Sequence, residues 1–208
     1  NVGTSAPATG GNLNGVYANL YINGEGGSDT LNVDDTGDSN ANTGTLTSTT
    51  ITGLGMTVGI TYGTIEQLNI GLGTVGDVFT IQSTHVGVTN LNGNNGNDFL
   101  NIQTISGITT VYGDNGSDTF NVGNAGGIVD GIGALLTING NDPTSGSDVL
   151  NVDDSGDTLG NTGVLTAATI TGLGMAGSIA YGTIETLNIG LGSGGDTFTI
   201  AGTHAGTT

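Results

Sequence analysis

Aspartates that follow glycine-rich turns are the residues of this sequence best suited to chemistry. Six of them precede short alternating apolar segments, namely Asp29, Asp77, Asp98, Asp118, Asp148 and Asp196. A carboxylate is a hard oxygen ligand, and glycine lets backbone carbonyl groups converge, so such turns suit Ca²⁺, which takes about six to eight oxygen ligands. The alternative is that glycine and aspartate only form turns, with the carboxylate capping backbone amides.

The two most complete turns, Gly93–Asn101 and Gly113–Asn121, lie about 20 residues apart. They predict one calcium site between neighbouring turns, for which the candidate residues are Gly93, Asn95, Gly96, Asp98, Gly113, Asn115, Gly116 and Asp118. A third turn offers Gly24, Gly27 and Asp29. The turns before Asp77, Asp148 and Asp196 lack glycine positions, and they are the less complete candidates for the same metal.

A second acidic cluster occurs twice, as Asp34, Asp35 and Asp38 and as Asp153, Asp154 and Asp157. It does not match an EF-hand loop, because Ser39 stands at the position of the turn glycine and Thr45 at that of the bidentate glutamate. We predict a solvated turn here rather than a second cation site. His85, His204, Glu66 and Glu185 each stand alone, without the second group that metal binding or acid–base catalysis needs, so we do not expect an enzyme.

An internal repeat organises the chain. Gly27–Asp38 matches Gly146–Asp157 without gaps, and the match continues as far as His85 and His204 at the same offset. We therefore divide the chain into a first repeat unit, 1–120, which begins within a strand, and a second, truncated unit, 121–208, in one continuous solenoid. The simplest expectation is an excerpt from a longer array.

Alternating apolar residues predict the strands that hold these turns. Each aspartate opens a segment with two inward positions, as in Leu31 and Val33 or Phe79 and Ile81, and a second series of strands covers 68–70, 89–91 and 109–111. Coils of this length cannot bury their apolar side chains alone, but coils stacked about 4.8 Å apart can. The sequence predicts an all-β fold, a right-handed parallel β-solenoid with coils of about 20–24 residues.

The charge of the chain excludes several classes of partner. There are 18 acidic residues and no Lys or Arg among 208 residues, which gives a net charge of −18. Nucleic-acid binding and attachment to anionic membranes both need cationic side chains, so neither is expected. The chain has no Cys, and we expect neither a leader peptide nor a membrane-inserted segment in this stretch, since it has no apolar run of sufficient length. The 42 glycines indicate a narrow core.

The glycine–aspartate turns resemble the nonapeptide repeats of haemolysin-type (RTX) calcium-binding proteins, whose pattern is Gly-Gly-x-Gly-x-Asp-x-apolar-x. Gly93–Asn101 and Gly113–Asn121 match it at the first and fourth glycines, the aspartate and the apolar position. The resemblance implies a β-solenoid with Ca²⁺ held between neighbouring turns, as in very large repetitive surface and secreted proteins of bacteria. This chain departs from the pattern because its turns recur once per coil of about 20 residues rather than every nine.

We interpret the chain as a structural or adhesive repeat protein located outside the cell or on its surface, a rod stabilised by Ca²⁺. Its expected partners are neighbouring repeats of the same protein or identical chains stacked end to end as a filament, since solenoid ends expose strand edges. An ice-binding module is an alternative, with Thr45, Thr47, Thr49, Thr50 and Thr52 or the outward series Asn32, Asn101, Asn121 and Asn151 as its flat face. A polysaccharide-cleaving enzyme is the least favoured interpretation.

Overall fold

Two long β-sheets form the protein. The computed structural model describes residues 1–141 and 146–208, which contain 18 strands and no helix that is long and apolar enough to cross a membrane. Sheet 1 runs in the order β1 (Leu20–Asn23), β5 (Gly59–Gly63), β4 (Thr50–Gly53), β3 (Thr43–Leu46), β7 (Val78–Ile81), β9 (Phe99–Ile102), β11 (Thr119–Val122), β13 (Val149–Asp153) and β17 (Thr186–Gly190). Sheet 2 runs in the order β2 (Thr30–Asp34), β6 (Gln67–Gly71), β8 (Val88–Asn92), β10 (Thr109–Tyr112), β12 (Leu135–Asn139), β16 (Ser178–Gly182), β15 (Thr169–Gly172), β14 (Thr162–Leu165) and β18 (Thr197–Ile200).

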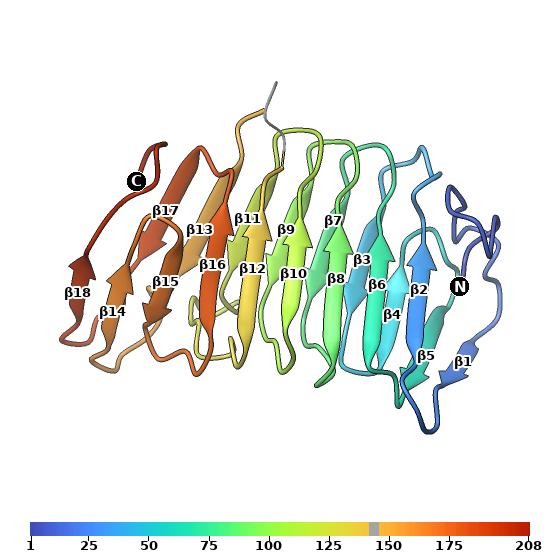
Figure 1. Cartoon of the computed structure of the whole chain (residues 1–208), viewed down its shortest axis with the longest axis horizontal. Helices are drawn as coiled ribbons and strands as arrows, with labels where there is room; N and C mark the ends of the chain where they lie inside the picture. The colour runs from blue at the N-terminus through green and yellow to red at the C-terminus, as the bar shows by residue number, and fades with distance from the viewer. Residues whose placement is uncertain (142–145) are drawn as a thin grey trace.

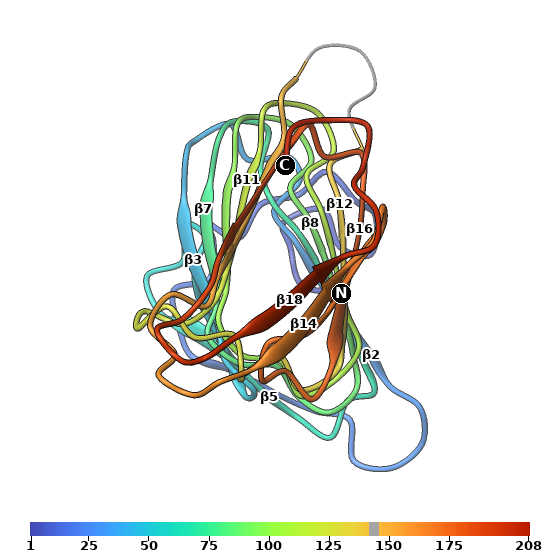
Figure 2. The same cartoon turned by 90° about the vertical axis from the view of Figure 1, so that its left-hand side faces the viewer.

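The chain winds between the two sheets, which confirms the predicted all-β, solenoid-like architecture. From β7 to β13 each strand lies in the opposite sheet from the one before it, and neighbouring strands pair in parallel, as Val78 with Phe99 and Phe99 with Thr119. The strands stand side by side along the long axis of the molecule (Figure 1). Seen along that axis, the two sheets face each other (Figure 2).

The core is a narrow column between the sheets, filled by the inward positions of each strand. The predicted inward pairs are confirmed for β7 and β11, where Phe79, Ile81, Phe120 and Val122 are all buried. The prediction is wrong for β18, the last strand of sheet 2, where Ile200 is 63% exposed. Asn and Thr occupy the outward positions between them, as Asn121 does in β11. Apolar burial therefore links each coil mainly to the coils on either side of it.

Parallel pairing does not extend to every strand, contrary to our expectation. In each repeat one strand is replaced by an antiparallel meander of three, β3–β4–β5 in sheet 1 and β14–β15–β16 in sheet 2. Three consecutive residues with positive φ, Gly53 (80°), Leu54 (52°) and Gly55 (73°), reverse the chain after β4. The Tyr62 hydroxyl then donates to the Thr47 carbonyl oxygen at 2.6 Å and ties β5 to the start of the meander.

The two repeats occupy opposite sheets, which the sequence did not predict. In the first repeat β2 pairs with β6 in sheet 2, and in the second the matching strands β13 and β17 pair in sheet 1 with the same register. The meander moves in the other direction, from sheet 1 to sheet 2. The second repeat is therefore turned by half a coil relative to the first.

Candidate functional site

The aspartates of the glycine–aspartate turns form a continuous row at one corner of the solenoid. Asp77, Asp98, Asp118 and Asp148 directly precede β7, β9, β11 and β13 of sheet 1, and all four are buried. The carboxylates of Asp98, Asp118 and Asp148 each accept the backbone N–H of the aspartate one coil earlier, at 2.6 Å from Asp77 to Asp98 and 2.8 Å for the other two pairs. Asp77, the first of the row, accepts the N–H of Asn42 at 2.7 Å. The row therefore joins successive coils through charge-assisted hydrogen bonds.

Not all of the predicted corner residues belong to this row. Asp29 and Asp196 precede β2 and β18, which lie at the two ends of sheet 2. Glu66 accepts the N–H of Asp29 and Glu185 that of Asp148, each at 2.7 Å. The two glutamates that the sequence left without a role thus extend the capping pattern.

The glycines and asparagines of the turns make the close stacking possible. A Cβ at Gly93 would stand 2.6 Å from Asp98 Oδ2 and from the Gly113 carbonyl oxygen, so the carboxylate rests against a bare Cα. Gly96 and Gly116 have φ of 124° and 145°, a region that favours glycine. The side-chain amide of Asn115 donates to Asn95 Oδ1 at 2.9 Å across the two turns. Gly24 likewise rests against Asp29, and Gly27 has φ of 127°.

These contacts bear on the predicted calcium site between Asp98 and Asp118. The Oδ1 atom of Asp98 accepts a backbone N–H, while its Oδ2 atom is buried without a hydrogen-bond partner. Burial raises the pKa of Asp98 to about 7, and the neighbouring charges of Asp118, Asp77 and Asp114 act in the same direction. The observed hydrogen bonds are those of the capping alternative, and calcium at this corner stays a prediction.

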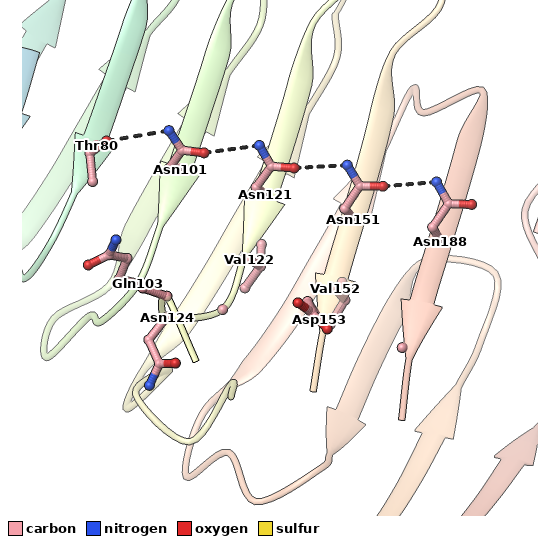
Figure 3. A pocket seen from close by; sticks show the side chains of 13 residues that line it. Thr80, Asn101, Gln103, Asn121, Val122, Asn124, Asn151, Val152, Asp153 and Asn188 are labelled. Atoms are coloured by element: carbon pink, nitrogen blue, oxygen red, sulfur yellow. Dashed lines mark hydrogen bonds between the residues drawn. The ribbon is translucent and has the colours of Figure 1, made fainter. Parts of the chain in front are cut away.

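Outward asparagines form a second type of ladder on each sheet. In sheet 1 each side-chain amide donates to the residue one strand earlier, along Thr80, Asn101, Asn121, Asn151 and Asn188, at distances of 2.8–3.3 Å (Figure 3). In sheet 2 the same pattern follows Asn1, Asn32, Asn69 and Asn90. The series proposed as one ice-binding face is therefore divided, because Asn32 lies in sheet 2 and the other three in sheet 1.

Each asparagine ladder forms the floor of a shallow hollow. The hollow on sheet 1 has a volume of about 530 Å³ and is bordered by Gln103, Asn124 and Asp153 (Figure 3). A hollow of about 570 Å³ occupies the matching place on sheet 2, with Asp34 where the other has Asp153. The repeat has thus produced two similar polar surfaces, one on each sheet.

The prediction of a solvated acidic loop is wrong. Asp35 and Asp38 of the first repeat and Asp154 and Asp157 of the second are buried. Burial raises the pKa of Asp35 to about 7. The reason is that each loop folds against an earlier segment of its own repeat, upstream of the gap-free match, as the Leu13 N–H donates to Asp35 Oδ1 at 2.8 Å and the Val129 N–H to Asp154 Oδ1 at 3.2 Å.

Asp130 joins the second of these loops, and sequence reasoning overlooked it. One oxygen from each of Asp130, Asp154 and Asp157 lies within 4.8 Å of the others, and within the described residues this is the one cluster of three candidate metal ligands. The gap-free repeat begins only at Gly27, so residue 130 had no aligned counterpart to draw attention to it.

The two histidines have a structural environment. His85 packs edge-on against Tyr62 with ring centroids 6.0 Å apart, and His204 packs in the same way against Tyr181 at 5.9 Å. Burial lowers the pKa of His85, which favours the neutral imidazole.

Comparisons with known proteins give no match to this chain. No protein-family model matches it, and neither do curated proteins or solved structures. The resemblance of the corner turns to RTX repeats therefore rests on the motif positions alone.

Proposed function

We propose that this protein is a structural rod, a right-handed solenoid with a basic coil of about 20–24 residues that acts outside the cell or on its surface. The observation that carries the proposal is that both repeats reproduce the same strand pairing on opposite sheets. Thr30 pairs with Gln67 in sheet 2 as Val149 pairs with Thr186 in sheet 1. A fold that continues itself in this way is suited to extension.

Because successive repeats are rotated by half a coil, the two sheets gain the same number of strands over two repeats. One repeat length, from β2 to its equivalent β13, contains the 11 strands β2 to β12, and the meander places six of them in sheet 1 against five in sheet 2. The next repeat has its meander in sheet 2, so the excess changes sides. Because every strand adds about 4.8 Å, unequal sheets would bend the solenoid, and the alternation favours a straight rod.

The junction between repeats is also the same at both places where it occurs. Val122 of β11 pairs with Val152 of β13, and Val2 bridges to Val33 of β2 in the matching position. Every donor in both asparagine ladders points toward the N-terminal end of the molecule. A further repeat, or the end of an identical chain, would therefore find matching backbone and side-chain partners.

The composition supports the extracellular part of the proposal. The chain lacks Lys and Arg, the residues at which trypsin-like proteases cleave, and it lacks Cys. Its acidic corners need counter-charge from solution, and Ca²⁺ is the divalent ion we propose for that role.

Solution scattering of lengthened chains tests the rod. Because Val33 and Val152 are equivalent, the 119-residue segment Asp34–Val152 can be inserted once or twice after Val152 without interrupting a strand. We expect the maximum dimension to grow by roughly 26 Å per inserted segment, since its 11 strands divide between two sheets at about 4.8 Å each.

The cross-section should stay constant in the same measurements. A globular or flexibly jointed chain would instead increase its radius of gyration less than linearly, and that result would reject the rod. Equilibrium sedimentation of the parent chain over a range of concentrations separates a single long chain from a filament of short ones, because only the filament increases in mass.

A further inference from the structure

Three carboxylates converge in the second repeat, beside the asparagine hollow of sheet 1. They belong to Asp130, which is exposed, and to Asp154 and Asp157, which are buried. Their nearest oxygens lie within 4.8 Å of one another. Like charges at this separation repel strongly in a partly buried setting, so the arrangement requires a compensating group.

Asp154 provides an independent indication of what is missing. It is 1% exposed, and its Oδ1 atom accepts the Val129 N–H. Its Oδ2 atom is buried and has no hydrogen-bond partner. Burial raises the pKa of Asp154, and the charges of Asp157 and Asp130 raise it further. A buried carboxylate oxygen without a donor is costly unless a cation or a proton occupies the space beside it.

The first repeat has the same site with one residue changed. Asn14 occupies the place of Asp130, since a Cβ at Gly55 would collide with Asn14 Oδ1 as a Cβ at Gly174 would with Asp130 Oδ1. Asn14 donates its side-chain N–H to Asp38 Oδ2 at 3.1 Å. There an uncharged amide donates a hydrogen bond to the acidic pair, whereas in the second repeat a third carboxylate replaces that donor.

An asparagine that both repeats share completes the comparison. Asn42 donates to Asp38 Oδ2 at 2.9 Å and approaches Asp35 Oδ2 at 3.5 Å. The side-chain amide of its equivalent, Asn161, donates to the matching Asp157. In the second repeat Asp154 therefore lacks the asparagine contact that Asp35 has in the first, and this is the repeat in which the extra carboxylate of Asp130 appears.

We propose that Asp130, Asp154 and Asp157 form a calcium site that the first repeat lacks. Ca²⁺ binds oxygen at about 2.3–2.6 Å, so ligands on opposite sides of one ion stand about 4.6–5.2 Å apart and the observed separations fit around it. Mg²⁺ is disfavoured because it requires near-ideal octahedral geometry at about 2.0–2.1 Å and gives up its waters reluctantly. Softer metals are disfavoured because His and Cys are absent from the cluster.

The position of Asp130 gives the ion a path to solvent. Asp130 is exposed while the other two ligands are buried, so a hydrated ion can meet Asp130 first and then exchange water for the inner oxygens. The close contact of Asp130 with the bare Cα of Gly174 fixes the side chain over the pair. Since Gly55 holds Asn14 in the same way, the two residues can be exchanged without altering the backbone.

Calorimetric titration with CaCl₂ after chelator treatment tests the site. Relative to the parent chain, we expect Asp130→Asn to lose one bound ion per chain and Asn14→Asp to gain one. The control is Asp153→Asn, which removes the same charge from the same loop outside the cluster and should leave the stoichiometry unchanged. MgCl₂ in place of CaCl₂ should bind at least tenfold more weakly at this site.

Two results would overturn the proposal. One is a parent chain that binds no calcium at millimolar concentration, and the other is an Asp130→Asn chain that binds as many ions as its parent. Circular dichroism checks that the variants fold. If Asp130→Asn does not fold, Asn14→Asp decides alone, because failure to gain an ion would contradict the role given to the third carboxylate.

Discussion

At the scale of single residues, the corner aspartates combine full burial of a carboxyl group with hydrogen bonding between coils. Asp98 is 0% exposed, and its Oδ1 atom caps the amide of Asp77. The same burial raises its pKa to about 7. The carboxyl group therefore stabilises the stacking geometrically, while its ionisation opposes folding above that pH.

The replacement Asp98→Asn separates these two effects. The folded pKa of about 7 lies above the value of 3.8 in the unfolded chain, so the folded state retains a proton between these values and the contribution of Asp98 to stability falls as pH rises through that range. We expect the melting temperature of Asp98→Asn relative to the parent to increase from pH 5 to pH 8 in chelator. Each pKa unit is worth about 1.4 kcal/mol, and about 1 kcal/mol shifts the melting temperature of a domain of this size by roughly 2–4 °C.

The same pair of proteins tests calcium at the corner. If Ca²⁺ binds between Asp98 and Asp118, adding it at pH 8 should raise the melting temperature of the parent chain more than that of Asp98→Asn, which keeps only the cluster of Asp130, Asp154 and Asp157. Equal increases in the melting temperatures of the two proteins would support only the capping interpretation of this corner. A difference between the two proteins that does not change with pH would contradict the raised pKa.

Gly116 should tolerate no side chain. Its φ is 145°, and a Cβ would collide with the Gly96 carbonyl oxygen of the neighbouring coil. We expect Gly116→Ala to lower the free energy of unfolding by more than about 1 kcal/mol, measured by urea denaturation. Gly195→Ala is the matched control, because a Cβ there meets nothing within 4 Å and should leave stability unchanged or slightly increased. Equal effects of the two would contradict the stacking of the turns.

At the scale of elements, strands were predictable from the sequence and the meanders were not. Period-2 alternation is a local property, so Phe79 and Ile81 could be assigned to the core in advance, and both are 0% exposed. Antiparallel pairing of β4 with β3 and β5 depends on tight chain reversals, one of them at Gly53–Gly55, rather than on strand alternation. A strand followed by Gly-Leu-Gly was the available signal, and it was not used.

The acidic loops show a similar limit. Their residues and spacing were identified, but their burial was not, because it depends on segments such as Leu13 and Val129 that pack against them from more than 20 residues away. Whether a carboxylate in this fold is solvated is decided by these distant contacts. Asp130 belongs to such a segment and therefore escaped a search based on spacing.

The asparagine ladder makes its own prediction at this scale. Asn121 donates to Asn101 at 3.0 Å and accepts from Asn151 at 2.9 Å, whereas Asn188 makes a single ladder bond, to Asn151 at 2.8 Å. At about 1 kcal/mol per bond, Asn121→Ala should cost about 2 kcal/mol and Asn188→Ala about 1 kcal/mol in urea unfolding. If Asn188→Ala proves equal to or worse than Asn121→Ala, the ladder does not contribute bond by bond.

At the scale of the whole molecule, the sheet that each repeat occupies depends on whether the chain has crossed between the sheets an odd or an even number of times. The repeat was visible in the sequence, but the sheet that each copy occupies follows from an odd number of crossings between sheets, which only the complete winding reveals. Removing a whole coil takes away two crossings, so every later strand should stay in its sheet. Removing half a coil takes away one crossing, so every later strand would have to move to the opposite sheet.

Deletion of Phe99–Asp118 removes one complete coil, β9 and β10 together. Asp98 is then followed by Thr119, the residue that pairs with Phe99 in the present structure, so β7 can pair directly with β11 and β8 with β12. We expect the shortened chain to keep its β-type circular dichroism spectrum and its cooperative unfolding. Its maximum dimension in solution scattering should decrease by about 5 Å, one strand spacing.

Deletion of only Phe99–Ile108 is the matched control. It would place Thr110 and Tyr112 at the inward positions of Leu100 and Ile102 and turn Val111 outward, because the burial phases of β9 and β10 are opposite. One-residue changes of phase move every apolar side chain of a strand to the wrong face, so this shorter deletion should unfold the chain or expose its core to hydrophobic dyes. A half-coil deletion as stable as the full-coil deletion would show that the coils are not the cooperative units of the rod, since stability would then not depend on which face each strand presents.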